Sequence, residues 1–234
     1  MIALKNLTKI KEITLKMNKV LDLGGGRHPL PYATHVIDLS PYSQYKVNKD
    51  LPSQRLESLD PNFEPRFTNK TWLVHDVCED KLPFEDNFFD FCFCSHLLED
   101  IRDPINACKE IIRVSKAGYI ETPSREREIF SKARFFKLKS FLGRMPQIGF
   151  YHHRWFVELI DNELTFTAKD GRIFSDDKRF IRRSELGRKM SDEESALSFF
   201  WKDDFKYSEK FLSEDMNELE EYKIQALKKL HSNK

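Results

Sequence analysis

Hydrophobic and polar positions follow one another in short blocks along the first half of the chain. Five apolar runs have the length and the flanking polar residues of strands, and they lie near residues 19–23, 35–38, 72–75, 89–94 and 117–121. Between the last two runs, apolar residues recur at helical spacing, which predicts a helix over 104–114 with Asp103 as its cap and Pro104 in its first turn. Strands that alternate with helices are typical of an α/β fold with a doubly wound, mostly parallel sheet.

The N-terminal segment and the first crossover differ from this regular pattern. A short N-terminal helix is expected from four apolar residues at helical spacing, which are Leu4, Leu7, Ile10 and Ile13. Only the eleven residues from Gly24 to Thr34 join the first two apolar runs, and they include Pro29 and Pro31. Proline interrupts helices, so at most about one helical turn fits in this crossover.

The alternation stops after Pro123. Residues 125–145 have the pattern of a basic amphipathic helix, with seven Lys/Arg against two Glu. From about residue 176 the chain is charged and helical in pattern. It ends in an apolar stripe that we expect to pack on the core or on a second subunit in a homodimer, formed by Leu212, Met216, Leu219, Ala226, Leu227 and Leu230.

An antiparallel hairpin is predicted within this second half. Two strand-like runs, 154–160 and 163–167, are separated by Asp161 and Asn162, which favour a tight turn. We expect this hairpin to finish an edge of the sheet. We therefore predict one domain, with residues 1–124 as the α/β core and residues 125–234 completing it.

Composition and charge narrow the possibilities. With 234 residues and 40% hydrophobic content, the chain can bury one substantial core. The 39 basic and 38 acidic residues leave a formal charge of +1, which argues against a globally basic nucleic-acid binder and leaves local patches open. No apolar run approaches the roughly 20 residues that cross a bilayer.

The cysteines are expected to be reduced thiols. All four lie in or beside apolar segments of a chain without a signal-peptide pattern, as Cys78, Cys92, Cys94 and Cys108. With His75 and His96 they invite comparison with a zinc site, but no C-x-x-C pair is present. We therefore predict packed core thiols, no metal and a cytoplasmic protein.

The strongest chemical signal is a glycine turn. The strand near 19–23 carries one acid and runs directly into Gly24, Gly25 and Gly26. Residues without a Cβ allow a tight turn and a close approach of the backbone to a ligand. The second strand ends on Asp38, where a parallel sheet would place a ribose-binding carboxylate. The pair indicates a bound nucleoside. The alternatives are a plain strand turn and a nicotinamide-binding fold.

Four ordered segments over about residues 19–124 resemble the class I S-adenosylmethionine-dependent methyltransferases, particularly the branch that methylates small molecules. These segments are Asp22-Leu23-Gly24-Gly25-Gly26, Asp38, His75-Asp76-Val77 followed by the signature from Leu82 to Asp90, and Ser95 to Ile101 with Asp103-Pro104. The resemblance implies a Rossmann-like sheet, S-adenosylmethionine as cofactor and direct in-line methyl transfer. A nicotinamide-binding fold would not account for the third segment. The region 125–234 would then shape the acceptor pocket.

The resemblance also implies roles for individual residues. The glycines at 24–26 would pass beneath the amino-acid part of the cofactor, and Asp38 would accept hydrogen bonds from both ribose hydroxyls. Asp76 would receive the adenine amino group and Val77 would lie along the ring. Ser95 begins the segment that would line the methyl-transfer cavity, and we count it among the cofactor-binding candidates.

Two of the acids have a second interpretation. Asp22 would either be a solvated strand end or organise the glycine loop and the sulfonium side, and we favour the latter. Asp76 would either cap a turn or contact adenine.

Acceptor chemistry points to histidines. If the acceptor is a hydroxyl, a base is needed as its proton leaves, and an imidazole is easily poised near neutral pH. His96 is the candidate base, with a structural histidine as the equal alternative. His152, His153 and Arg154 cluster before the hairpin and could hold an anionic acceptor, or face solvent.

The basic segment 125–145 leaves several partners open. It could be a lid, a phosphate clamp, a peripheral membrane contact or a packed helix with a solvated rim. We predict methyl transfer to an oxygen or nitrogen of a small-molecule, glycan or lipid-linked acceptor. The alternatives are a catalytically silent interaction or regulatory module and a nucleic-acid methyltransferase. No Asn/Asp-Pro-Pro-Tyr/Phe motif supports the last of these.

Overall fold

The computed structural model describes most of the chain, which divides into two compact units. The described residues are 4–26, 28–48, 64–79, 81–131, 148–169, 171, 178–211 and 216–232. The first unit comprises residues 1–122 and 198–207, and the second comprises 123–197 and 208–234. The division near 122 lies close to the predicted end of the core at 124. The return of 198–207 to the first unit was not predicted.

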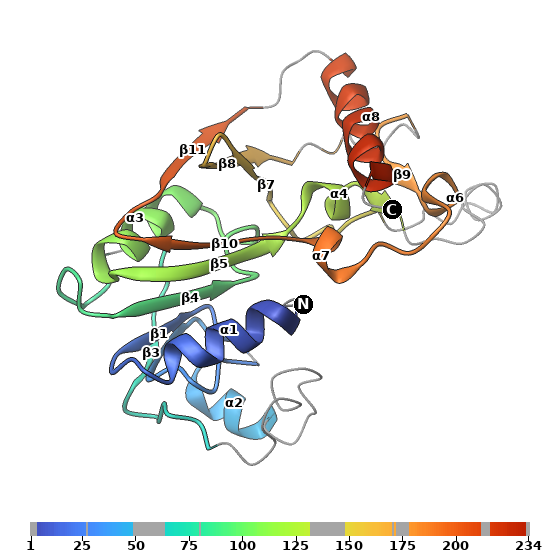
Figure 1. Cartoon of the computed structure of the whole chain (residues 1–234). Coiled ribbons are helices and arrows are strands. Elements are labelled where there is room, and N and C mark those ends of the chain that lie inside the picture. The colour runs from blue at the N-terminus through green and yellow to red at the C-terminus, as the bar shows by residue number, and fades with distance from the viewer. Residues whose placement is uncertain are drawn as a thin grey trace. The chain divides into compact units, whose positions relative to one another are not determined.

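A six-stranded sheet forms the centre of the first unit (Figure 1). Its strand order is β10-β5-β4-β1-β2-β3, and the pairs β5/β4, β4/β1, β1/β2 and β2/β3 are parallel. The strands are β1 (Val20–Leu23), β2 (His35–Asp38), β3 (Trp72–Val74), β4 (Phe91–Ser95), β5 (Ala117–Pro123) and β10 (Ala196–Lys202). The five predicted strands and the mostly parallel α/β sheet are confirmed.

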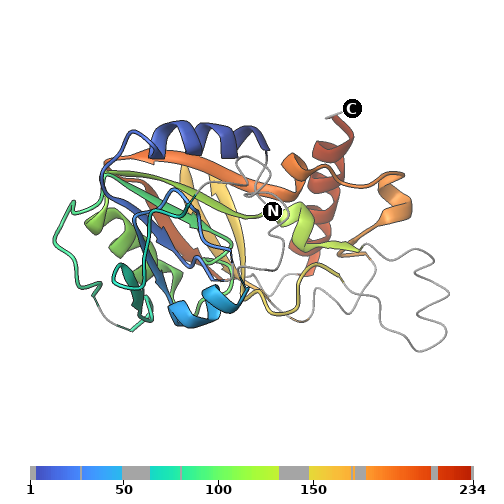
Figure 2. The same ribbon diagram turned by 90° about the horizontal axis from the view of Figure 1, so that it is seen from below.

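Helices cover both faces of this sheet. Figure 2 shows α1 (Leu4–Thr14) along one face and α3 (Pro104–Val114) on the other side. Ile10 of α1 packs in a core cluster with alternate residues of the strands, among them Val20, Val36, Phe91 and Phe93. Both helices were predicted, and α3 has the predicted bounds. Asp103 caps α3, because its Oδ1 accepts the backbone N–H of Asn106 at 2.8 Å.

The connection between β1 and β2 is as predicted, whereas the connection after β2 contains a helix that was not predicted. The crossover from Gly24 to Thr34 holds no helix in its described residues, as its two prolines predict. A short helix, α2 (Tyr42–Asn48), follows β2 and was not predicted. The Tyr42 and Tyr45 side chains of α2 pack against Trp72 of β3.

The predicted hairpin lies in the second unit. β7 (Trp155–Ile160) and β8 (Glu163–Ala168) pair antiparallel, and both turn residues have positive φ, 50° for Asp161 and 63° for Asn162. The expectation that this hairpin finishes an edge of the main sheet is wrong. It belongs to a three-stranded sheet with β11 (Lys206–Lys210), and β10 and β3 are the edges of the main sheet.

The basic helix predicted over 125–145 is wrong in its first part. α4 spans only Arg125–Glu128. The chain then enters β6 (Phe130–Ser131), which pairs in parallel with β9 (Ile181–Arg182). Tertiary pairing and burial of Glu128 outweigh the local helical pattern. The rest of the predicted helix, 132–145, lies outside the described residues.

The charged segment from 176 onward is less helical than predicted. Among its described residues it contains β9, β10 and β11, together with the short helices α6 (Arg183–Leu186) and α7 (Asp192–Ser195). The long helix α8 (Met216–Ser232) is confirmed. Ala226 and Leu230 of its apolar stripe are buried in a core cluster of the second unit, and Leu227 packs against that cluster. Leu212 and the side chains of Met216 and Leu219 lie outside the description.

The cysteines are free thiols, most of them in the core, as predicted. All four cysteines are free, and Cys92, Cys94 and Cys108 are buried. Burial raises the pKa of each of these three thiols.

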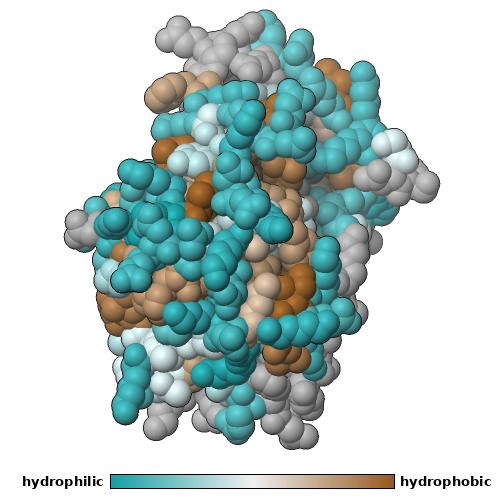
Figure 3. Space-filling view, turned by 60° about the vertical axis from the view of Figure 1, so that its left-hand side comes forward, coloured by the Kyte–Doolittle hydropathy of each residue, from teal (hydrophilic) through white to brown (hydrophobic). Residues whose placement is uncertain are grey.

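No helix in the described part of the chain has the length and apolarity that a membrane crossing needs. The face in Figure 3 carries mainly hydrophilic side chains with separated apolar areas.

Candidate functional site

The glycine turn after β1 has a backbone that larger residues would not adopt. Gly24 and Gly26 have positive φ values of 81° and 51°. A Cβ at Gly24 would lie 2.9 Å from the Leu97 side chain, and one at Gly25 would lie 2.9 Å from both Asp22 Oδ2 and Pro29 Cβ. Around Gly26 the nearest atoms are 3.8 Å away, so the turn is packed on one side and open at its last glycine.

Asp22 lies next to this turn and binds the crossover that follows it. Its side chain is buried, and its Oδ2 accepts the backbone N–H of Leu30 at 2.6 Å, across the short crossover. Burial raises the pKa of Asp22 to about 7, against the opposing effect of the Leu30 N–H, and the nearby charge of Asp38 adds to the rise. Asp22 is therefore a buried group that organises the loop rather than a solvated strand end.

Asp38 links the end of β2 to the glycine turn. Its Oδ2 accepts the N–H of Gly26 at 2.8 Å, and its Oδ1 accepts the N–H of Ser40 at 2.7 Å. A carboxylate oxygen has two lone-pair sites, so each oxygen can accept a further donor. The side chain is thus held in one orientation at the carboxyl end of its strand.

Asp76 follows the neighbouring strand. β2 and β3 are parallel with Asp38 opposite Val74, so Asp76 lies just beyond the carboxyl end of β3. Its Oδ1 accepts the N–H of Cys78 at 2.9 Å, and its Oδ2 pairs with Arg102 at 2.8 Å. The Cys78 N–H and the Arg102 guanidinium lower the pKa of Asp76, although partial burial opposes them. Asp76 caps a turn, as one of its two interpretations predicted, and is held ionised.

His96 follows β4 and is bound by two buried carboxylates. Its Nδ1 lies 3.1 Å from Glu99 Oε1 and its Nε2 lies 3.4 Å from Glu121 Oε1. Burial alone would lower the pKa of His96, but the bonds to Glu121 and Glu99 outweigh it and raise the pKa to about 9. The backbone of His96 has a φ of 56°, in the left-handed region that residues other than glycine seldom adopt.

A hydrogen-bond network extends behind this histidine. Tyr119 donates from its hydroxyl to Glu121 Oε2, and Asn6 donates to the Tyr119 hydroxyl at 3.0 Å. Glu99 and Glu121 are each only 1% exposed, whereas the His96 side chain is 33% exposed. Sequence reasoning missed Glu121 and Tyr119 as parts of this site. The available signal was an acid inside the otherwise apolar run 117–121.

A comparison with known families identifies this arrangement. Residues 21–120 match the family model described as a methyltransferase domain. The matched stretch contains the glycine turn, both strand-end acids and His96. This stretch, slightly less than half of the chain, is similar to a methyltransferase domain. The match supports the predicted resemblance over this part of the chain, and the sheet topology confirms the predicted fold class.

Solved structures of methyltransferases are also similar to this chain. An S-adenosylmethionine-dependent methyltransferase from Mesorhizobium loti shares 18% sequence identity, with a TM-score of 0.33 over 47% of this chain and 49% of that chain. A phosphoethanolamine N-methyltransferase 2 from Haemonchus contortus shares 19% identity, with a TM-score of 0.34 over 63% of this chain and 34% of that chain. The chain spans about half the length of the first solved structures it matches. No curated protein matches it.

The cofactor of this class of domain is S-adenosylmethionine, and the residues of the methyltransferase domain fit it in two respects. The turn at Gly24 to Gly26 exposes backbone at its open end, where an added Cβ would meet nothing closer than 3.8 Å. Asp38 stands beside that opening with acceptor capacity left on both oxygens. A glycine turn followed by an acid at the end of the second strand suits a nucleoside.

Two other predicted cofactor residues differ in exposure. The Val77 side chain is buried, and its carbonyl accepts from Asn106 Nδ2 at 2.9 Å, so Val77 also anchors α3. Ser95 ends β4, is partly exposed and lies opposite Glu121 in the sheet register. Ser95 therefore borders the carboxylate that holds His96.

The three predicted acceptor-binding residues lie in the second unit and do not share one environment. His152 and Arg154 are exposed, whereas His153 is buried. His153 Nδ1 pairs with Glu128 Oε1, and Lys169 Nζ lies 2.7 Å from Glu128 Oε2. His153 is thus part of a buried ionic cluster, and exposure leaves His152 and Arg154 as the accessible pair.

Proposed function

We propose that the methyltransferase domain transfers a methyl group from S-adenosylmethionine to an oxygen or nitrogen of a small-molecule, glycan or lipid-linked acceptor. One observation carries the proposal: within the matched domain, Asp38 holds the N–H of Gly26 at 2.8 Å and so joins a glycine turn to a strand-end acid. This is the arrangement that parallel sheets use to bind a nucleoside at the carboxyl ends of their strands.

The chain's own residues would provide binding and alignment. When bound, S-adenosylmethionine supplies a methyl group that its sulfonium makes electrophilic, so alignment of the reactants is the main requirement. Gly24, Gly25 and Gly26 would face the amino-acid part and Asp38 the ribose. Asp76 would accept from adenine, in exchange for part of its pairing with the half-exposed Arg102.

His96 would take the proton of the acceptor in its neutral form. With a pKa of about 9, only about one molecule in a hundred carries the neutral imidazole at pH 7. Methyl transfer should therefore become faster as the pH rises toward 9. In its protonated form, His96 would instead donate a hydrogen bond to the acceptor. We retain His152 and Arg154 as candidates for binding an anionic acceptor.

Titration calorimetry of the full chain with S-adenosylhomocysteine tests the proposal. Asp38→Ala should weaken binding by about 1–3 kcal/mol, because the ribose hydroxyls of the bound ligand and the N–H of Gly26 lose their acceptor. Asp192→Ala removes an exposed acid of α7 in the second unit and serves as the matched control. If the folded wild-type chain does not bind S-adenosylhomocysteine, the proposal fails.

A second candidate function is favoured by the state of His96. Two buried carboxylates raise its pKa to about 9, and the imidazolium form that this favours at pH 7 cannot accept a proton. A domain that binds the cofactor without turnover would need no base, and it would serve as an interaction or regulatory module. Tight S-adenosylhomocysteine binding without methyl transfer between pH 7 and pH 9.5 would favour this alternative.

A further inference from the structure

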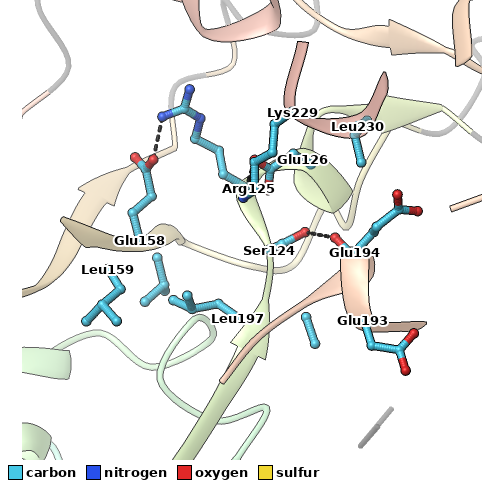
Figure 4. Close-up of a pocket in the computed structure, with 12 residues that line it drawn as sticks. Ser124, Arg125, Glu126, Glu158, Leu159, Glu193, Glu194, Leu197, Lys229 and Leu230 are labelled. Atoms are coloured by element: carbon cyan, nitrogen blue, oxygen red, sulfur yellow. Dashed lines mark hydrogen bonds and ion pairs between the residues drawn. The ribbon is translucent and has the colours of Figure 1, made fainter. Parts of the chain in front are cut away.

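The second unit contains a pocket that none of the preceding assignments uses. Its cavity volume is about 230 Å³. Figure 4 shows its walls, which come from α4, α7, β7, α8 and the first two residues of β10. α4 packs against α7, β7 and α8, so the pocket is built into the packed unit. Apolar side chains form one part of the lining, namely Val157, Leu159, Ala196, Leu197 and Leu230.

The charged part of the lining is predominantly acidic. Glu126, Glu158, Glu193 and Glu194 line the pocket, and the only basic residues among the lining residues are Arg125 and Lys229. Arg188, which is not among the lining residues, pairs with both oxygens of Glu194 at 2.7 and 2.6 Å. With Arg188 counted, four negative and three positive side chains leave a formal charge of −1. Like charges around a partly desolvated cavity repel one another, so a cation inside it is favoured.

Carboxylate oxygens remain available to a ligand in spite of the ion pairs. Arg125 Nη1 pairs with Glu158 Oε1, and Lys229 Nζ lies 2.8 Å from Glu126 Oε1. Each pair uses one oxygen, and no hydrogen-bond donor of the described chain reaches Oε2 of either glutamate. Glu193 is exposed and has no partner among the described residues. Figure 4 shows Glu158 and Glu193 on different walls.

The shape and the charge together define a ligand class. An ammonium group has three N–H donors, which match several carboxylate oxygens on different walls. A short alkyl chain attached to it would cover the apolar lining, whereas a metal ion would leave that lining exposed. We propose that this pocket binds a small organic ammonium ion. The inference is independent of methyl transfer, because the proposed cofactor residues all lie in the first unit.

Binding of n-butylammonium chloride to the full chain tests the pocket, with n-butanol and sodium butyrate as neutral and anionic probes of the same length. We expect ligand-observed NMR titration to show binding of the ammonium alone. Glu193→Gln should weaken this binding about two- to fivefold, because one exposed charge is removed. Glu158→Gln/Glu193→Gln removes two of the four lining carboxylates, reverses the sign of the local charge and should weaken this binding about tenfold or more.

Controls separate this site from nonspecific attraction and from the cofactor site. Glu221→Gln, on the exposed side of α8 and outside the pocket lining, should bind n-butylammonium like the wild type. All three variants should keep the wild-type affinity for S-adenosylhomocysteine, which also shows that they are folded. Equal binding of n-butanol, an equal loss in Glu221→Gln, or no binding of n-butylammonium to the wild type would each overturn the proposal.

Discussion

Two equally buried carboxyl groups, Asp22 in the first unit and Glu128 in the second, have opposite environments. In the first unit, Asp22 is buried with a single backbone donor, and burial raises its pKa to about 7. In the second unit, Glu128 is equally buried, but it pairs with His153 and Lys169 and accepts the N–H of Phe150. Burial alone would raise the pKa of Glu128, and the bonds from His153 and Lys169 instead hold it below its ordinary value.

This difference separates a functional environment from a structural one. A carboxylate with strong compensating partners stabilises the fold only in its charged form. A carboxyl group without such a partner is poised to titrate, which is a property of functional sites more often than of cores. Asp22 lies directly before the glycine turn, whereas Glu128 lies in α4 of the second unit. The contrast therefore predicts opposite responses to removal of the two charges.

The largest effect is expected at Glu128. Glu128→Gln leaves the ammonium of Lys169, which is 5% exposed, without its carboxylate. Breaking a buried ion pair on one side costs about 3–5 kcal/mol, so the free energy of unfolding should fall by that amount. Urea denaturation at pH 7 measures it. Glu221→Gln, at an exposed position of α8, should change the stability by less than about 0.5 kcal/mol.

A double variant sharpens this prediction. Glu128→Gln combined with Lys169→Met removes the carboxylate and its ammonium partner together, and it should recover part of the lost stability because no uncompensated ammonium stays buried. A cost below about 1 kcal/mol for Glu128→Gln alone would contradict the structural role of the cluster.

Asp22→Asn should have the next largest effect, with the opposite sign. The pKa of Asp22 is about 7 in the folded chain against an ordinary value of 3.8, so the folded state binds more protons between these values. Its contribution is fully present below pH 3.8 and is lost as the pH rises through 7. The amide that replaces the carboxyl group does not titrate. Between pH 4 and pH 8, the variant should therefore gain about 2–4 kcal/mol relative to the wild type.

Stability curves of the two proteins at several pH values measure this difference. Any constant cost of the amide is the same at each pH, so the pH dependence isolates the carboxyl group. A difference that does not change between pH 4 and pH 8 would mean that Asp22 is ionised throughout, and the contrast with Glu128 would then disappear.

The same contrast explains which elements were predictable from sequence. The strands of the first unit, the helix over 104–114 and the hairpin are encoded locally, by apolar runs, an Asp-Pro start and a turn of Asp161 and Asn162. α4 is not encoded in this way. Its helical pattern continues to Met145 in the sequence, yet the helix ends at Glu128, whose charge is neutralised by partners 25 and 41 residues further along the chain.

β10 was missed for a related physical reason. Its sequence, Ala-Leu-Ser-Phe-Phe-Trp-Lys, follows a charged stretch with a helical pattern. Its position at the edge of the sheet depends on β5, far away in the sequence. A Cβ at Gly118 of β5 would lie 2.6 Å from Trp201 Nε1, so this close packing requires glycine. Neither residue shows locally that it has this partner.

The candidate site also contains residues that local sequence predicts and residues that it does not. The glycine turn and the two strand-end acids follow from motif and spacing, so they were found. Glu121 was not, because an acid in an apolar strand gains its meaning only from the histidine that it faces across the sheet, on the residue after β4.

His96 provides the smallest and most specific test. Its pKa is about 9 in the folded chain against an ordinary value of 6.5, since Glu121 and Glu99 outweigh the effect of burial. The resulting stability is fully present below pH 6.5 and is lost as the pH rises through 9. Because the side chain is 33% exposed, solvent screening reduces the effect to about 1–2 kcal/mol. His96→Asn, which does not titrate, should lack this loss.

Thermal unfolding of wild type and His96→Asn at pH 6, 7.5 and 9.5 measures the difference directly. Glu121→Gln should shift the fall in stability to lower pH, because one of the two bonds that raise the pKa is weakened, while His96 remains. If wild type and His96→Asn keep the same stability difference from pH 6 to pH 9.5, the imidazole is not held as a cation. His96 would then be neutral at pH 7 and directly available as the base, and the rate of methyl transfer would no longer need to rise toward pH 9.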